Sequence, residues 1–80
     1  MSDPTGSGER LVQMANDIAD YFVSEPDREL AVSGMVLHLE RFWERRMLDR
    51  ICAIHADGAA VLNDLAREAV SCIADSRSAR

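Results

Sequence analysis

The chain has 80 residues, 48% of them hydrophobic and only 5% aromatic, which is enough for one hydrophobic core and too little for two. Alanine, leucine, valine, isoleucine and methionine are abundant, which favours helices over aromatic-rich strands, so we expect an all-α fold. All nine basic residues are arginine, but the net charge of −5 opposes contact with phosphate backbones and anionic lipid, so neither nucleic acid nor a membrane is an expected partner.

Residues 1–8 are rich in serine, glycine and proline and predict a disordered N-terminal tail. A first helix is expected from Glu9 to Ser24, where apolar side chains recur every three or four residues. Its predicted inner face consists of Leu11, Met14, Ala15, Ile18 and Phe22. Pro26 ends this helix because proline cannot continue a helical ladder, and Asp27 is placed to cap the next helix.

The second helix is predicted from about Arg28 to Phe42. Its predicted inner stripe consists of Leu30, Ala31, Gly34, Leu37, His38 and Arg41 or Phe42. Gly34 is a weak helix former whose small size permits close packing against another helix. A third helix is predicted over residues 45–56, with Asp57-Gly58 as its stop signal. Its apolar spacing is carried by Met47, Leu48, Ile51, Cys52, Ile54 and His55.

The fourth helix is predicted after Gly58, from Ala59 to Ile73, followed by a polar C-terminal tail over residues 75–80. Its predicted inner stripe consists of Leu62, Leu65, Ala66, Ala69, Val70 and Ile73. Four short helices joined by short connections predict a small antiparallel bundle. This bundle is expected to form a single helical domain over residues 9–74.

The expected compartment is the cytoplasm. No apolar run approaches the roughly 20 residues that span a bilayer, and residues 1–10 lack the basic start and apolar stretch of a signal peptide. Cys52 and Cys72 are too few for a disulfide scaffold, and each lies in a helical pattern. Two free thiols in a reducing compartment are therefore expected.

Catalytic and metal-binding patterns are weak in this sequence. Cys52 and His55 share one helical face and could join Cys72 and His38 in a zinc site, but no second C-x-x-C or H-x3-H pair accompanies them. No serine or cysteine lies in a recognisable nucleophile elbow, and no glycine-rich loop follows a strand. We therefore predict no catalytic, cofactor-binding or metal-binding residue, and rank a small zinc protein last among the alternatives.

Residues 40–47 gather the only tryptophan, one of the two phenylalanines and three of the nine arginines. In one interpretation, Phe42 and Trp43 close the end of the bundle while the arginines pair with nearby acids. In the other, the segment is an interface anchor, because tryptophan and arginine are the residues most enriched at binding hot spots. Neighbouring helical positions point about 100° apart, so the two aromatic residues are not both expected to face one core.

Three stretches carry a family resemblance: Leu11 to Ile18 followed by Tyr21-Phe22, then His38 to Met47, then Leu62 to Val70. In this order and spacing they resemble the delta subunit family of cytoplasmic, NAD-dependent, molybdenum-containing formate dehydrogenases, over nearly all of residues 9–73. The chain departs from the family where Asp-Pro is usual, having Glu44-Arg45 and Asn63-Asp64. Without proline at position 45, the second and third helices are free to run together.

The resemblance implies a non-catalytic accessory subunit that carries no cofactor itself. Its partners would be the larger formate dehydrogenase subunits, which hold the molybdenum cofactor, iron–sulfur clusters and flavin. Within that complex it would aid assembly, stability or cofactor maturation of the catalytic molybdenum subunit, the first expected partner. The rival interpretation is a free-standing helical adaptor or regulator that binds another protein, and a homodimer in isolation stays open.

The contact surface is expected to be formed or supported by five residues, with Trp43 as its anchor. They are Asn16, Phe42, Trp43, Arg46 and Met47. Asn16 is included because an amide on a largely apolar helix face can bond a backbone group across a helix junction, although a cap-like internal role is an equal alternative.

Overall fold

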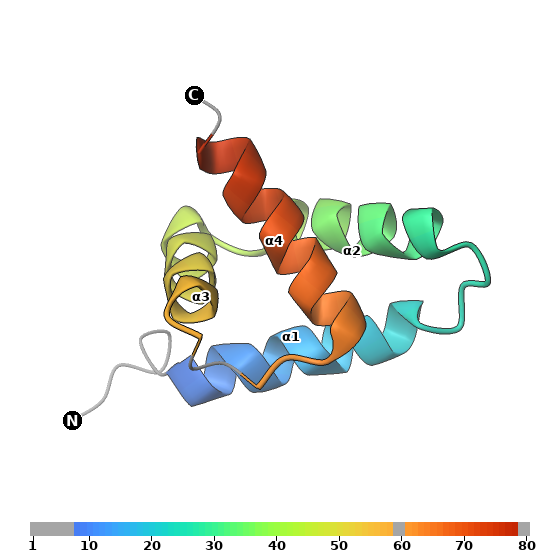
Figure 1. Cartoon of the computed structure of the whole chain (residues 1–80), viewed down its shortest axis with the longest axis horizontal. Coiled ribbons are helices and arrows are strands. Elements are labelled where there is room, and N and C mark those ends of the chain that lie inside the picture. Colours follow the sequence, from blue (N-terminus) through green and yellow to red (C-terminus); the bar gives the residue numbers. More distant parts are fainter. Residues whose placement is uncertain (1–7, 59–60, 79–80) are drawn as a thin grey trace.

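The computed structural model describes residues 8–58 and 61–78, and these residues form four α-helices and no strand. The helices are α1 (Gly8–Phe22), α2 (Arg28–Phe42), α3 (Arg45–Ala56) and α4 (Asp64–Ser78). Helices α1 and α2 run antiparallel, α3 lies across the end where α1 begins and α2 ends, and α4 crosses over the pair (Figure 1). The predicted all-α fold and its four-helix bundle are confirmed.

The core is built from small and aliphatic side chains at every third or fourth helical position. On α1 and α2 the buried residues are Leu11, Ala15, Ala19, Ala31, Met35 and Leu39, and on α4 they are Leu65, Ala66, Ala69, Val70 and Ile73. The alanines let helix axes approach closely, and every pair of helices is in contact, most extensively α2 with α4. Helix α4 therefore holds the other three together.

The ends of the first three helices follow the local signals in the sequence. Asp27 caps α2, because its Oδ1 accepts hydrogen bonds from the backbone N–H of Glu29 at 3.0 Å and of Leu30 at 3.4 Å. Gly58 follows α3 with φ +74°, a left-handed conformation that suits glycine at a helix end. These helix boundaries agree with the prediction to within two residues at each end.

Helices α2 and α3 do not run together. Trp43 and Glu44 both have extended backbone conformations, with φ/ψ of −91°/141° and −70°/155°, and they separate the two helices. This break turns Trp43 into the core, where 7% of it stays exposed. The burial of one large aromatic side chain thus accompanies a helix boundary that lacks the family's proline.

Helix α4 begins at Asp64, later than the predicted Ala59, because Asn63 caps it. The side chain of Asn63 accepts a hydrogen bond from the backbone N–H of Ala66 at 2.9 Å. The backbone carbonyl of Asn63 accepts a second hydrogen bond, from the backbone N–H of Arg67. Leu62, although buried, therefore precedes the helix instead of belonging to it. Ala59 and Ala60, where the predicted helix began, lie outside the described residues.

At its other end α4 continues past the predicted Ile73 to Ser78, so residues 75–78 are helical. Arg77 forms an ion pair with Asp49 of α3, which ties this last turn to the bundle. The predicted N-terminal tail lies outside the described residues except for Gly8, the first residue of α1. The division into one domain with two tails stays a prediction.

The inner face predicted for α2 is wrong in part. Ala31, Met35 and Leu39 are the buried residues, whereas Leu30 is 59% and Leu37 63% exposed. The helix carries apolar side chains on nearly every side, so its sequence does not single out one face, and contact with α4 decides which stripe is buried. A second apolar stripe therefore stays on the surface. No helix in the described residues is long and apolar enough to cross a membrane.

Candidate protein-interaction surface

An aromatic ladder runs along the outer side of α1 and α2. It consists of Tyr21, Phe22, His38 and Phe42, whose successive ring centroids lie 5.1, 6.0 and 4.8 Å apart. Its two ends are open to solvent, since Tyr21 is 78% and Phe42 69% exposed. Together with the exposed Leu30 and Leu37 of α2, the ladder leaves large apolar side chains on one helix pair.

Gly34 sets the position of the ladder on α2. A Cβ atom at this position would lie 2.9 Å from Cε1 of Phe22, closer than real side chains approach. The absent side chain thus lets the Phe22 ring lie directly on the α2 backbone, next to His38 one turn later. His38 in turn contacts Phe42, so the exposed ring at the end of α2 is held by packed neighbours and not only by its own backbone.

Four of the five predicted site residues come together where α2 meets α3. Phe42 and Trp43 point in opposite senses, one exposed and one buried, which confirms that they do not share the core. Arg46 is exposed on the first turn of α3, and Met47 is half-buried against the core. The predicted anchor, Trp43, is thus the residue of this group with the least surface to offer a partner.

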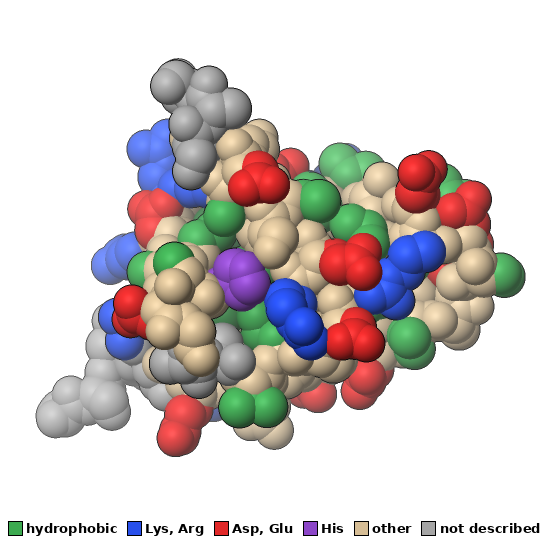
Figure 2. Space-filling view, in the orientation of Figure 1, with side chains coloured by type: hydrophobic (Ala, Val, Ile, Leu, Met, Phe, Trp, Pro, Cys, Tyr) green, Lys and Arg blue, Asp and Glu red, His purple; other side chains and the backbone are tan. Residues whose placement is uncertain are grey.

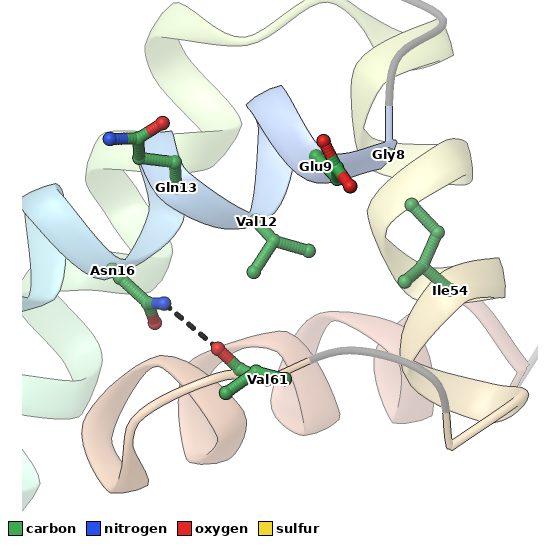
Figure 3. Close-up of a pocket in the computed structure, with 7 residues that line it drawn as sticks. All are labelled: Gly8, Glu9, Val12, Gln13, Asn16, Ile54 and Val61. Carbon is green, nitrogen blue, oxygen red and sulfur yellow. Dashed lines mark hydrogen bonds between the residues drawn. The ribbon is translucent and has the colours of Figure 1, made fainter.

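Asn16 lies apart from this group and joins α1 to the segment before α4. Its Nδ2 donates to the carbonyl of Val61 at 2.9 Å (Figure 3). Its Oδ1 accepts from the backbone N–H of Asn63 at 2.9 Å. The Nδ2 of Asn63 donates back to the carbonyl of Asn16 at 3.4 Å. Asn16 therefore bonds backbone groups across a helix junction, one of the two roles considered from the sequence.

A groove of about 630 Å³ lies beside this junction. Figure 3 shows the side chains of Val12 and Val61 around it, with Ile54 approaching from α3. The described residues that line it are Gly8, Glu9, Val12, Gln13, Asn16, Ile54 and Val61. The sequence did not indicate this groove, because its walls come from three separate parts of the chain.

Seven of the eight described arginines fall into two groups. Three form ion pairs: Arg28 with Glu68, Arg67 with Asp64, and Arg77 with Asp49. The pair between Arg28 and Glu68 joins α2 to α4, and the hydrogen bond from Arg28 lowers the pKa of the Glu68 carboxyl. The second group, which we call the arginine corner, consists of Arg41, Arg45, Arg46 and Arg50.

The polar groups that suggested zinc or catalysis are dispersed. His55 and Ser71 lie 3.0 Å apart, Nε2 to Oγ, and bridge α3 to α4. In residues 8–58 and 61–78 no carboxylate hydrogen-bonds His55 to orient it, and no three potential ligands lie close enough for a metal ion. Both cysteines are free, and burial raises the pKa of the Cys52 thiol.

Comparison with known proteins gives one family. The profile of the NADH-dependent formate dehydrogenase delta subunit FdsD matches residues 10–70. This range covers α1, α2 and α3 almost completely and the first half of α4, and it includes both the aromatic ladder and the arginine corner. No curated protein and no solved structure matches the chain at a significant level.

Proposed function

The chain belongs to the NADH-dependent formate dehydrogenase delta subunit family, and from this premise we propose that it is a non-catalytic accessory subunit of a cytoplasmic formate dehydrogenase. Its role is to aid assembly, stability or cofactor maturation of the catalytic subunit. The family match, which spans more than half of the chain, is the observation that carries this proposal. The partner is a larger formate dehydrogenase subunit, the catalytic molybdenum subunit first.

The contact surface of this subunit centres on the α2–α3 junction. Phe42 supports this choice, because an exposed ring at the end of a packed ladder is a preorganised contact that loses little conformational entropy on binding. Arg46 and Met47 extend the surface along α3. Trp43 supports this surface by filling the core beneath the junction, whereas Asn16 supports the bundle by fixing the start of α4.

Two substitutions at this junction separate contact from support. Phe42→Ala is expected to weaken binding to the large subunits by about tenfold or more while leaving the melting temperature nearly unchanged. Trp43→Ala is expected to cost about 3–5 kcal/mol of stability, since it leaves a cavity in the core. Val61→Ala, at a residue that is 82% exposed and lies apart from the junction, is the control for both.

The measurement is the affinity of the purified chain for the isolated large subunits, together with thermal unfolding of each variant. Binding that survives Phe42→Ala unchanged would remove this residue from the contact surface. Wild-type protein that binds none of the subunits would contradict the accessory role itself and favour a free-standing adaptor. A homodimer of the isolated chain, seen by sedimentation, is expected to dissociate when the large subunits are added if both use the apolar face of α2.

A further inference from the structure

The arginine corner gathers four arginines that form no ion pair within the described residues. Within residues 8–58 and 61–78, no carboxylate lies within ion-pair distance of any of its four arginines, all of which are exposed. Of the acids nearest in sequence, Asp49 pairs with Arg77 instead. Figure 2 shows basic side chains gathered along the edge formed by α3, with acidic ones between them.

The rest of the chain is strongly acidic, so this concentration is local. Residues 40–50 hold four arginines against three acids, while the remainder of the chain holds five arginines against eleven acids. Residues 40–50 therefore carry a formal charge of +1, opposite in sign to the net charge of −5 of the whole chain. A ligand attracted here by charge must present its negative groups over a small area, because a long polyanion would also meet the acidic surface.

The first turn of α3 carries charges that are unfavourable for a helix N-terminus. Arg45 and Arg46 occupy its first two positions, where the helix dipole already places positive charge. Glu44, the residue before them, makes no capping hydrogen bond with its side chain. The other three described helices each have an acid in the first turn. A carboxylate brought to this turn by a partner would relieve the unfavourable charge.

An exposed aromatic ring accompanies these charges. Phe42 follows Arg41 directly at the end of α2 and is held from the other side by His38. Burial of such a ring against apolar side chains is favourable, and a phosphate backbone offers no apolar surface of this kind. Arginine binds carboxylates through two parallel hydrogen bonds, which gives direction to the contact.

We propose that the arginine corner and Phe42 dock together onto an acidic patch of a partner protein, in which carboxylates surround an apolar pocket for the ring. This inference rests on the proposed function and names the chemistry of the surface to which the subunit binds. The arginines steer and orient the encounter, and the ring supplies the buried contact.

The test is the affinity of the full-length chain for the purified large subunits at low and high sodium chloride. For wild-type protein, binding is expected to weaken by about tenfold or more between 50 and 500 mM salt, because exposed charges are screened. Arg46→Glu is expected to weaken binding by a similar factor at low salt and to reduce the salt dependence. Arg67→Glu makes the same change of charge on α4, outside the corner, and is expected to alter binding less than about threefold.

The melting temperature of Arg46→Glu distinguishes a loss of binding from a loss of folding. Replacing an arginine at the start of α3 with glutamate places a negative charge at a helix N-terminus, so the melting temperature of Arg46→Glu is expected to equal or exceed that of the wild type. If the wild type binds the subunits but neither salt nor Arg46→Glu affects the affinity, the inference is overturned and the accessory role survives. If the wild type binds no subunit, the proposed function fails. Tight binding to anionic vesicles or duplex RNA, lost in Arg46→Glu, would overturn the choice of an acidic protein.

Discussion

Replacement of Asn16 tests whether one amide fixes the entry of the chain into α4. In Asn16→Ala, two hydrogen bonds are lost, those to the carbonyl of Val61 and from the N–H of Asn63. Each is worth about 0.5–1 kcal/mol, the lower part of the usual range, because water reaches this junction. Alanine returns about 0.5 kcal/mol as the better helix former. The net loss is then about 1 kcal/mol, or about 4–8 °C in melting temperature for a domain of this size.

The assay is urea unfolding followed by circular dichroism, with Gln13→Ala as the matched control. Gln13 lies on the same helix and lines the same groove, but its side chain makes no hydrogen bond within the described residues, so Gln13→Ala is expected to change stability by less than about 0.5 kcal/mol. Amide hydrogen exchange gives a second readout, because the N–H of Asn63 loses its acceptor in the variant. Equal stability of the two variants, with unchanged protection at Asn63, would refute the assigned role.

Three further substitutions test the ladder, the start of α3 and the ion pair between α2 and α4. Gly34→Val is expected to cost about 1–3 kcal/mol by displacing the Phe22 ring, and to cost clearly less in a Phe22→Leu background; equal costs would show that the ring is not what limits space there. Glu44→Ser supplies a capping hydroxyl and is expected to stabilise the chain by about 0.5–1 kcal/mol in urea unfolding, whereas no gain would mean that the N–H groups of α3 are already satisfied. Glu68 has a lowered pKa in the folded state, so its contribution is present above the pKa of the unfolded chain and is lost as the pH falls through the folded value. The stability difference between wild type and Glu68→Gln should therefore narrow from pH 7 to pH 3, and a constant difference would show that the pair with Arg28 does not contribute.

The helix boundaries that follow from the sequence are those set by neighbouring residues. Asp27 caps the helix that begins beside it, and Gly58 ends the helix just before it. The start of α4 was missed because its determinant is distant: Asn16 bonds Val61 and Asn63 across 45 and 47 positions of the chain. A local signal existed in Asn63, a favourable N-cap residue, but the apolar spacing of the preceding segment also fits a helix.

The buried face of α2 could not be read from its pattern, because a helix with apolar residues on most sides fits a core in several rotations. Packing against α4 selects Ala31, Met35 and Leu39, and leaves Leu30 and Leu37 on the surface. The sequence therefore indicated a core stripe where part of a candidate interaction surface lies. This error concerns the tertiary contacts of the helix and not its existence or limits.

At the α2–α3 junction, helical geometry predicted that Phe42 and Trp43 would diverge, but not which of them would enter the core. The backbone decides this, because Trp43 has left the helix and its extended conformation directs the larger ring inward. The lack of ion pairs at the arginine corner could not be predicted from the sequence either, because helical spacing alone allowed Arg46 to pair with Asp49. The structure pairs Asp49 with Arg77 of α4 instead.

We propose above that this chain is an accessory subunit held on a formate dehydrogenase. The most direct measurement is affinity capture of the tagged full-length chain from native cytosol, scored by mass spectrometry and by formate-dependent reduction of NAD in the eluate. We expect the large iron–sulfur and flavin subunits to be recovered together with that activity, and Phe42→Ala to lower the yield of both. Recovery of the chain alone, or with unrelated regulatory proteins and no activity, would contradict it.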